Sequence, residues 1–176
     1  MTTTLIFFHS SVTSVQRLHP VGQSLDYLLG GGLPLASSVR ILIVDDSEPW
    51  RRAVCSFLQD NPVWQVIYEA TNGLEAIEKS RELQPDLILL DINMPGLNGI
   101  EAARQIQTLS PSSKILFLSE SRSPDVVREA FRVGGCGYVV KSDAASDLPA
   151  ALEAVVANKL FVGRRFPAVL SEFAGT

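Results

Sequence analysis

The sequence predicts an α/β protein built on an open, doubly wound sheet of five parallel strands. Three observations support this fold class. Short runs of apolar and β-branched residues recur from residue 39 onward, amphipathic stretches separate them, and the two kinds of segment alternate strictly. Runs that are apolar throughout are typical of parallel strands covered by helices on both faces. Because crossovers between parallel strands are right-handed, we expect the strand order 2-1-3-4-5.

Five segments have the composition of strands. They are residues 39–44, 64–70, 86–91, 114–119 and 137–140. The third begins and ends with an aspartate and is apolar at every position between, which predicts a central place in the sheet.

Amphipathic stretches between these strands predict five helices. The first is expected to bury Trp50, Val54, Phe57 and Leu58, and the others span residues 74–83, 100–109, 124–133 and 147–158. In the second helix, Leu74 and Ile77 should face the sheet. The last helix should be capped by Ser146, with Pro149 in its first turn, where a missing N–H costs little.

Composition excludes several classes of protein. The chain has 176 residues, 46% of them apolar, so it can bury one core of ordinary domain size. Fifteen Lys and Arg against nineteen Asp and Glu give a net charge of −4, which offers no general attraction for DNA. Cys55 and Cys136 lack the spacing of a disulfide framework or a zinc site. Without a membrane span or signal peptide in the sequence, we expect a cytoplasmic protein with no membrane contact.

The chain divides into three parts by composition. Residues 1–38 hold one arginine and one aspartate and finish in a glycine-rich run, which predicts a mobile N-terminal extension and linker. Residues 39–160 carry the alternating segments and form the predicted domain. Residues 161–176 are expected to be a short C-terminal tail with Arg164 and Arg165 solvated, since this length cannot hold a helix-turn-helix.

Polar residues stand at the carboxyl ends of four predicted strands. They are Asp45 and Asp46 after the first, Asp91 at the third, Ser119 at the fourth and Lys141 after the fifth. The first and third strands are neighbours in the predicted order, so Asp46 and Asp91 should face each other at the switch point where such sheets bind ligands. Each residue alone has an ordinary explanation as a helix cap, a turn residue or a solvated charge. Their convergence on one rim predicts a functional site.

Facing carboxylates indicate a bound cation. Two carboxylates at close range repel, and one is driven to protonate unless a cation offsets the field. Mg²⁺ prefers oxygen ligands and keeps several waters, which suits two carboxylates, a backbone carbonyl and a phosphate oxygen. The expected cofactor is therefore Mg²⁺.

Three segments together resemble the receiver domain of two-component response regulators. They are ILIVDDS at 41–47, DLILLDINMPGLNG at 86–99 and GYVVKS at 137–142. The resemblance covers about residues 39–159 and is strongest to receivers that precede a LuxR-type helix-turn-helix, because GYVVKSD stands where a Lys-Pro step is more usual. It implies the flavodoxin-like receiver fold.

The resemblance implies a phosphoacceptor and its metal ligands. Asp91 is similar to the carboxylate nucleophile that takes a phosphoryl group from a histidine kinase as an acyl phosphate. Asp46, Asp91 and the backbone carbonyl of Asn93 would hold Mg²⁺, and Asp45 would act partly through water.

The resemblance also implies a conformational switch. Lys141 would pair with the phosphoryl oxygens as a point charge. Ser119 would donate its hydroxyl to the phosphoryl group and draw the following loop inward, and Tyr138 would move with it. Glu120, directly after Ser119, departs from the small residue usual there. It either faces the phosphate entrance and alters phosphorylation and hydrolysis, or turns outward to solvent.

The function expected from the sequence is that of a stand-alone receiver that is not an enzyme beyond its own phosphorylation and dephosphorylation. Its partners are a histidine kinase and an unidentified downstream protein, with self-association left open. Residues 39–160 hold 12 basic and 17 acidic residues, so no DNA binding is expected. Two alternatives stay open: a truncated DNA-binding regulator without its helix-turn-helix, and a magnesium-dependent phosphohydrolase with an aspartate nucleophile. The first strand's Asp45-Asp46 departs from the Asp-x-Asp typical of those hydrolases.

Overall fold

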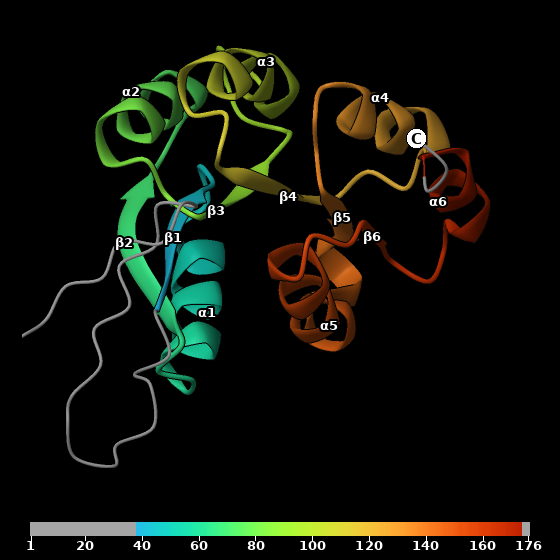
Figure 1. Cartoon of the computed structure of the whole chain (residues 1–176), viewed down its shortest axis with the longest axis horizontal. Helices are drawn as coiled ribbons and strands as arrows, with labels where there is room; N and C mark the ends of the chain where they lie inside the picture. Colours follow the sequence, from blue (N-terminus) through green and yellow to red (C-terminus); the bar gives the residue numbers. More distant parts are fainter. Residues whose placement is uncertain (1–37, 174–176) are drawn as a thin grey trace, which may run out of the picture. The chain divides into compact units, whose positions relative to one another are not determined.

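A computed structural model describes residues 38–173 of the chain (Figure 1). The strands are β1 (Val39–Val44), β2 (Trp64–Ala70), β3 (Leu87–Asp91), β4 (Lys114–Ser119), β5 (Gly137–Val140) and β6 (Phe161–Val162). The helices are α1 (Glu48–Gln59), α2 (Gly73–Leu83), α3 (Gly99–Leu109), α4 (Pro124–Arg132), the 3-10 turn η1 (Lys141–Asp143), α5 (Ala144–Val156) and α6 (Pro167–Phe173). The extension and linker expected over residues 1–38 lie outside the described residues, except for Ser38.

The strands form one parallel sheet in the order β2-β1-β3-β4-β5-β6. The predicted order 2-1-3-4-5 is confirmed, and the sheet has one strand more than predicted. Residues 161 and 162, which were assigned to a tail, pair in parallel with β5 as β6, with Phe161 opposite Gly137 and Val162 opposite Tyr138. β3 is buried along its whole length at the centre of the sheet, as its apolar sequence predicts.

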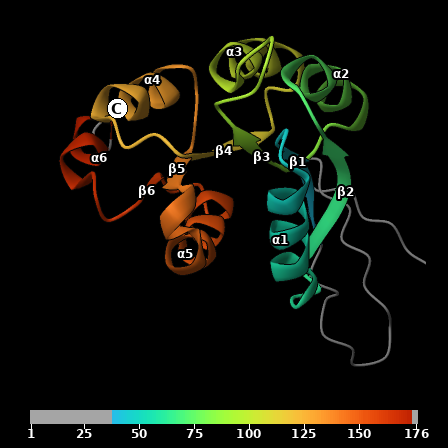
Figure 2. The ribbon, with the colours of Figure 1, turned by 180° about the vertical axis from the view of Figure 1, so that it is seen from behind.

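Helices cover both faces of the sheet. α1 and α5 lie on one face, and α2, α3, α4 and α6 lie on the other (Figures 1 and 2). Alternate residues of each strand enter the two cores: in β3, Leu87 and Leu89 pack towards α1 and α5, and Ile88 and Leu90 pack towards the opposite layer. The strands are therefore apolar throughout because both faces are buried.

Two apolar residues expected in the core are exposed. Leu74 is 69% exposed because α2 approaches the domain through its small residues: a Cβ on Gly73 would lie 2.4 Å from the carbonyl oxygen of Leu97. Phe57 is 41% exposed because α1 buries Val54 and Leu58. A helix buries residues four positions apart, so the neighbouring position turns towards solvent.

Helix α5 begins earlier than the helix predicted over residues 147–158. η1 runs directly into α5, whose first residue is Ala144, so Ser146 lies inside the helix instead of capping it. Its hydroxyl donates to the backbone carbonyl of Asp143 at 2.9 Å. Pro149 accordingly lies in the interior of α5 and not in its first turn.

None of the helices among residues 38–173 is both long and apolar enough to span a bilayer.

Candidate functional site

The carboxyl ends of β1, β3 and β5 bring the predicted acids and lysine together. Asp45 follows β1, Asp91 ends β3, and Lys141 follows β5. Each of Asp45, Asp46 and Asp91 offers a carboxylate oxygen within 4.8 Å of the others. The neighbouring positions of β1 and β3 cause this convergence, as expected at the switch point of a doubly wound sheet.

Lys141 bridges two buried carboxylates. Its Nζ lies 2.6 Å from Oδ2 of Asp45 and 3.1 Å from Oδ2 of Asp91. The three side chains are only 8%, 2% and 3% exposed. Such a group of charges is stable only as a set, because removal of the cation leaves two buried anions side by side.

Burial and charge shift the pKa values of this group. Burial raises the pKa of Asp91 and Asp45 adds to the rise, while Lys141 opposes it without cancelling it. For Lys141, burial favours the neutral amine, but the carboxylates of Asp45 and Asp91 outweigh burial and raise its pKa. The lysine is therefore fully charged at neutral pH, and the ionised form of Asp91 is the one that burial disfavours.

Asp45 and Asp46 are adjacent in sequence but lie in different environments. Asp45 is buried, and its Oδ1 accepts a hydrogen bond from the Ser47 amide at 2.9 Å. Asp46 is exposed at the rim. One acid of the pair is thus held by the fold and by Lys141, and the other is free to exchange water for a ligand.

The donor set fits a magnesium ion. Oδ1 of Asp91 is buried and makes no hydrogen bond, although it belongs to a carboxylate whose other oxygen contacts Lys141. A buried oxygen without a partner is costly unless a ligand satisfies it. Oxygen atoms of Asp45, Asp46 and Asp91 at this spacing are the ligands that Mg²⁺ prefers. Asn93 lies two residues beyond Asp91 on the exposed rim.

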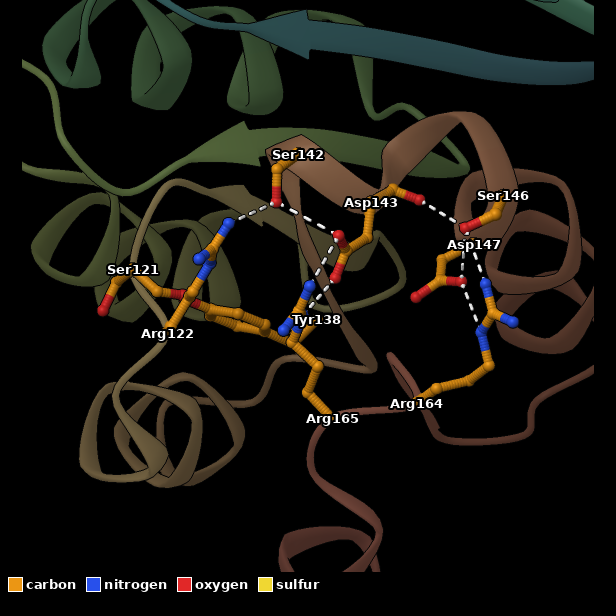
Figure 3. Close-up of polar contacts among 9 residues, drawn as sticks. All are labelled: Ser121, Arg122, Tyr138, Ser142, Asp143, Ser146, Asp147, Arg164 and Arg165. Atoms are coloured by element: carbon orange, nitrogen blue, oxygen red, sulfur yellow. Dashed lines mark hydrogen bonds and ion pairs between the residues drawn. The ribbon is translucent and has the colours of Figure 1, made fainter.

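Ser119 ends β4, and Tyr138 lies within the neighbouring strand β5, where it pairs with Phe117. Ser119 is buried, and its Oγ accepts a hydrogen bond from the Ser121 amide at 3.1 Å. The Tyr138 hydroxyl donates to the carbonyl oxygen of Ser121 at 2.9 Å, and burial raises the pKa of this phenol. Both predicted switch residues therefore contact the loop after β4, and Figure 3 shows Tyr138 and Ser121 of this loop. Glu120 is exposed, as it would be in either of its two expected orientations.

Gly99 packs closely against the backbone of Asp91. The Gly99 amide donates to the Ile92 carbonyl at 3.0 Å, where the loop after β3 enters α3. A Cβ at Gly99 would lie 2.0 Å from the backbone carbonyl oxygen of Asp91. Only glycine permits this close approach, so Gly99 is required for the loop after β3 to pack against the backbone of Asp91.

Two residues near the site were not predicted. Trp50 lies in α1 with its ring centroid 5.4 Å from Nζ of Lys141, a cation–π contact. The side chain of Arg51 is only 12% exposed, contacts Glu69 at 3.3 Å and donates to the Asp45 carbonyl at 2.8 Å. Neither residue could have been found from sequence spacing, because Lys141 and Glu69 reach them only through the packing of α1 against the sheet.

An open groove of about 1030 Å³ adjoins the acids. Asp46, Asn93 and Pro95 line its end at the site, and Arg104 and Glu129 line it between α3 and α4. The groove therefore reaches the site at Asp46, which has a carboxylate oxygen within 4.8 Å of one on Asp91.

Fold and site together define a class of protein: a doubly wound α/β domain with a buried aspartate, two further acids and a lysine at its switch point. The family model of the response regulator receiver domain matches residues 41–153. The chain therefore belongs to the response regulator receiver family.

Relatives and solved structures agree with this assignment. The transcriptional regulatory protein LnrK of Bacillus subtilis (strain 168) is 38% identical over 117 residues, which are 66% of this chain and 53% of LnrK. The chemotaxis protein CheY of Thermotoga maritima is 39% identical over 102 residues, 58% of this chain and 84% of CheY. A crystal structure of a LuxR-family two-component response regulator from Aurantimonas sp. SI85-9A1 superposes with a TM-score of 0.72 at 31% identity, covering 77% of this chain and 97% of that one. The chain spans about half the length of LnrK.

Proposed function

We propose that this chain accepts a phosphoryl group from a histidine kinase on Asp91, with Mg²⁺ bound, and passes the signal to a protein partner. The buried, unpartnered Oδ1 of Asp91 carries the proposal. It belongs to the last residue of the buried strand β3, with Lys141 beside the other oxygen and with Asp46, which lines the open groove, within 4.8 Å. The family supports the kinase as donor, because receiver domains take part in phosphorelay signalling.

Chemically, the Asp91 carboxylate is the nucleophile. One of its oxygens bonds to phosphorus while the bond from phosphorus to the donor breaks, which yields an acyl phosphate. Lys141 stabilises the negative charge on the transferred group, because its ammonium already lies 3.1 Å from the acceptor carboxylate. Asp45, Asp46, Asp91 and the Asn93 carbonyl would hold Mg²⁺, which supplies charge neutralisation for the phosphoryl oxygens when bound.

The switch follows from the position of Ser119. Its hydroxyl now accepts from the Ser121 amide, and in the phosphorylated protein it donates to a phosphoryl oxygen. This added hydrogen bond draws the loop after β4 towards Asp91, while Tyr138, which is already buried, keeps its hydroxyl bonded to the same loop. The face around α4 and β5 then differs between the two states, and a partner that prefers one face shifts the population.

A second output is supported by one comparison. LnrK is a transcriptional regulatory protein of which this chain spans 53%, so a receiver that controls a DNA-binding region is the second candidate. The site chemistry is identical in both cases, and only the element that reads the switch differs.

The proposed function is tested by labelling. Protein incubated with Mg²⁺ and a histidine kinase, or with a concentrated small phosphodonor, should gain one phosphoryl group by intact-mass measurement. Asp91→Asn should abolish the added mass. Asp60→Asn, which neutralises an exposed acid beyond α1, is the matched control and should label like the parent. Undiminished labelling of Asp91→Asn would sink the assignment.

A further inference from the structure

The segment of residues 161–173 continues the sheet beyond β5 and returns to cover Tyr138. We call it the 161–173 segment; it comprises β6, the following turn and α6. The backbone of β6 pairs with β5, and the Gly163 amide donates to the Tyr138 carbonyl at 3.0 Å. Phe166, 6% exposed, then places its ring edge-on to the Tyr138 ring, with centroids 6.1 Å apart and planes at 86°.

Tyr138 is consequently enclosed on all sides and is 0% exposed. Its backbone is held by β6, its ring by Phe166, and its hydroxyl by the Ser121 carbonyl. The 161–173 segment thus contacts both the ring and the backbone of Tyr138.

Further contacts fix the 161–173 segment to α4. Arg128 of α4 forms paired hydrogen bonds with the carboxylate of Glu172, with Nε 3.0 Å from Oε2 and Nη2 3.1 Å from Oε1. The rings of Phe131 and Phe173 stack with centroids 5.3 Å apart. α6 therefore lies against the helix that follows the loop moved by the proposed switch.

The turn between β6 and α6 contacts the element that follows Lys141. Arg165 donates to Asp143 at 3.2 Å, and Asp143 accepts from Ser142 at 3.1 Å (Figure 3). Ser142 in turn accepts from Arg122 at 3.1 Å in the loop after β4. The 161–173 segment is thus joined to both elements that must respond at Asp91, the loop carrying Ser121 and the turn beginning with Lys141.

We propose that the 161–173 segment restrains Tyr138 in its buried orientation and thereby prearranges the switch for the phosphorylated state. The proposal rests on the proposed function of Asp91. While Tyr138 is buried, its hydroxyl stays bonded to the Ser121 carbonyl. This bond holds the loop after β4 close to the position that it takes when Ser119 binds a phosphoryl group. Phe166 packs against the Tyr138 ring, so loss of the Phe166 ring should free Tyr138 to move. The segment therefore preorganises the loop, so that less conformational free energy is lost when Asp91 is phosphorylated or binds a phosphoryl mimic.

Coupling of this kind is reciprocal. If the attached segment favours the loaded site, loading must favour the attached segment by the same factor. The expected factor is about fivefold, at the low end of couplings between sites in one domain. Loading should therefore also slow hydrogen exchange in residues 161–173.

The test uses the phosphoryl mimic beryllofluoride with Mg²⁺, titrated into the full chain. Trp50 reports binding because its ring lies 5.4 Å from Nζ of Lys141, whereas Trp64 starts β2 at the opposite end of the sheet. Phe166→Ala should weaken beryllofluoride binding about fivefold. Phe57→Ala removes the same ring from the exposed face of α1 and should bind like the parent. Phe166→Leu keeps apolar volume if the alanine variant fails to fold, and should weaken binding in the same direction.

Two results would overturn the proposal while leaving the proposed function standing. One is parent-like beryllofluoride affinity in Phe166→Leu and in any folded Phe166→Ala. The other is hydrogen exchange over residues 161–173 that is unchanged or faster on loading of the parent. A parent chain that neither labels at Asp91 nor binds beryllofluoride rejects the proposed function, and the restraint on Tyr138 with it.

Discussion

The acidic site and the 161–173 segment both hold opposite charges together, but in opposite environments. In the site, Lys141, Asp45 and Asp91 are almost fully buried. In the segment, the Arg164 side chain that pairs with Asp147 is 80% exposed. Buried charges depend on one another, because each would otherwise be left in an apolar medium, whereas exposed pairs contribute little. The site is therefore organised by charge, and the segment is attached mainly by apolar side chains.

The largest effect should come from breaking the buried charge set. Lys141→Ala leaves Asp45 and Asp91 facing each other without a cation, so the metal-free protein should lose about 3 kcal/mol of unfolding free energy. Added Mg²⁺ should recover part of the loss, because it replaces the missing positive charge. Urea unfolding with and without Mg²⁺ measures both. Lys159→Ala changes an exposed lysine and is the control, which should unfold like the parent. Parent-like unfolding of Lys141→Ala would show that Lys141, Asp45 and Asp91 do not depend on one another.

A smaller loss is expected when the apolar attachment of the segment is weakened. Val169 of α6 is 2% exposed, so Val169→Ala removes buried methyl groups and should cost about 2 kcal/mol. Leu74→Ala removes more carbon from a side chain that is 69% exposed and should change the unfolding free energy far less. Equal losses in the two variants would show that α6 does not belong to the core.

Replacing Asp91 by a neutral residue should increase the unfolding free energy instead of lowering it. The pKa of Asp91 is raised above its ordinary value of 3.8, so the folded protein disfavours its ionised form at neutral pH. Metal-free Asp91→Asn should therefore be more stable than the parent at pH 7, on the order of 1 kcal/mol. As the pH falls through the raised pKa, the parent protonates and the advantage should shrink. Melting temperatures across acidic to neutral pH test this, and an advantage that grows on acidification contradicts it.

The smallest effect should come from removing Arg164, which is 80% exposed and pairs with the buried Asp147. Arg164→Ala should change the unfolding free energy by no more than about 0.5 kcal/mol. Asp147 is itself buried but keeps a hydrogen bond from the Ser146 hydroxyl at 3.0 Å. A loss in Arg164→Ala comparable to that in Lys141→Ala would remove the distinction between the two regions.

The same distinction explains what the sequence could predict. Asp45, Asp91 and Lys141 were expected together because parallel strands end on one rim, a rule that needs only the strand order. The order itself follows from strands long and apolar enough to recognise. β6 was missed because Phe161–Val162 is too short to show a pattern, and its place depends on a β5 neighbour distant in sequence.

Helix faces were predicted less well, for a physical reason. Leu74 was assigned to the core from its hydrophobicity, but α2 packs through Gly73, Ala76 and Ser80. Because these small residues let α2 approach closely, the larger Leu74 beside them is left facing solvent. The hydrophobicity of Leu74 does not reveal this arrangement. The pairing of Arg165 with Asp143 was likewise invisible, since it depends on a turn formed only after β6 joins the sheet.

Gly99 has a consequence for how the protein tolerates change. Its missing side chain lies against the Asp91 backbone, where a Cβ would stand 2.0 Å from the carbonyl oxygen. An alanine there cannot be accommodated by a side-chain rotation, because the obstacle is main chain. A saturation library should accordingly find position 99 almost as restricted as position 91, although the glycine carries no chemical group. Position 99 is thus restricted by the main chain of Asp91 and not by any chemistry of its own.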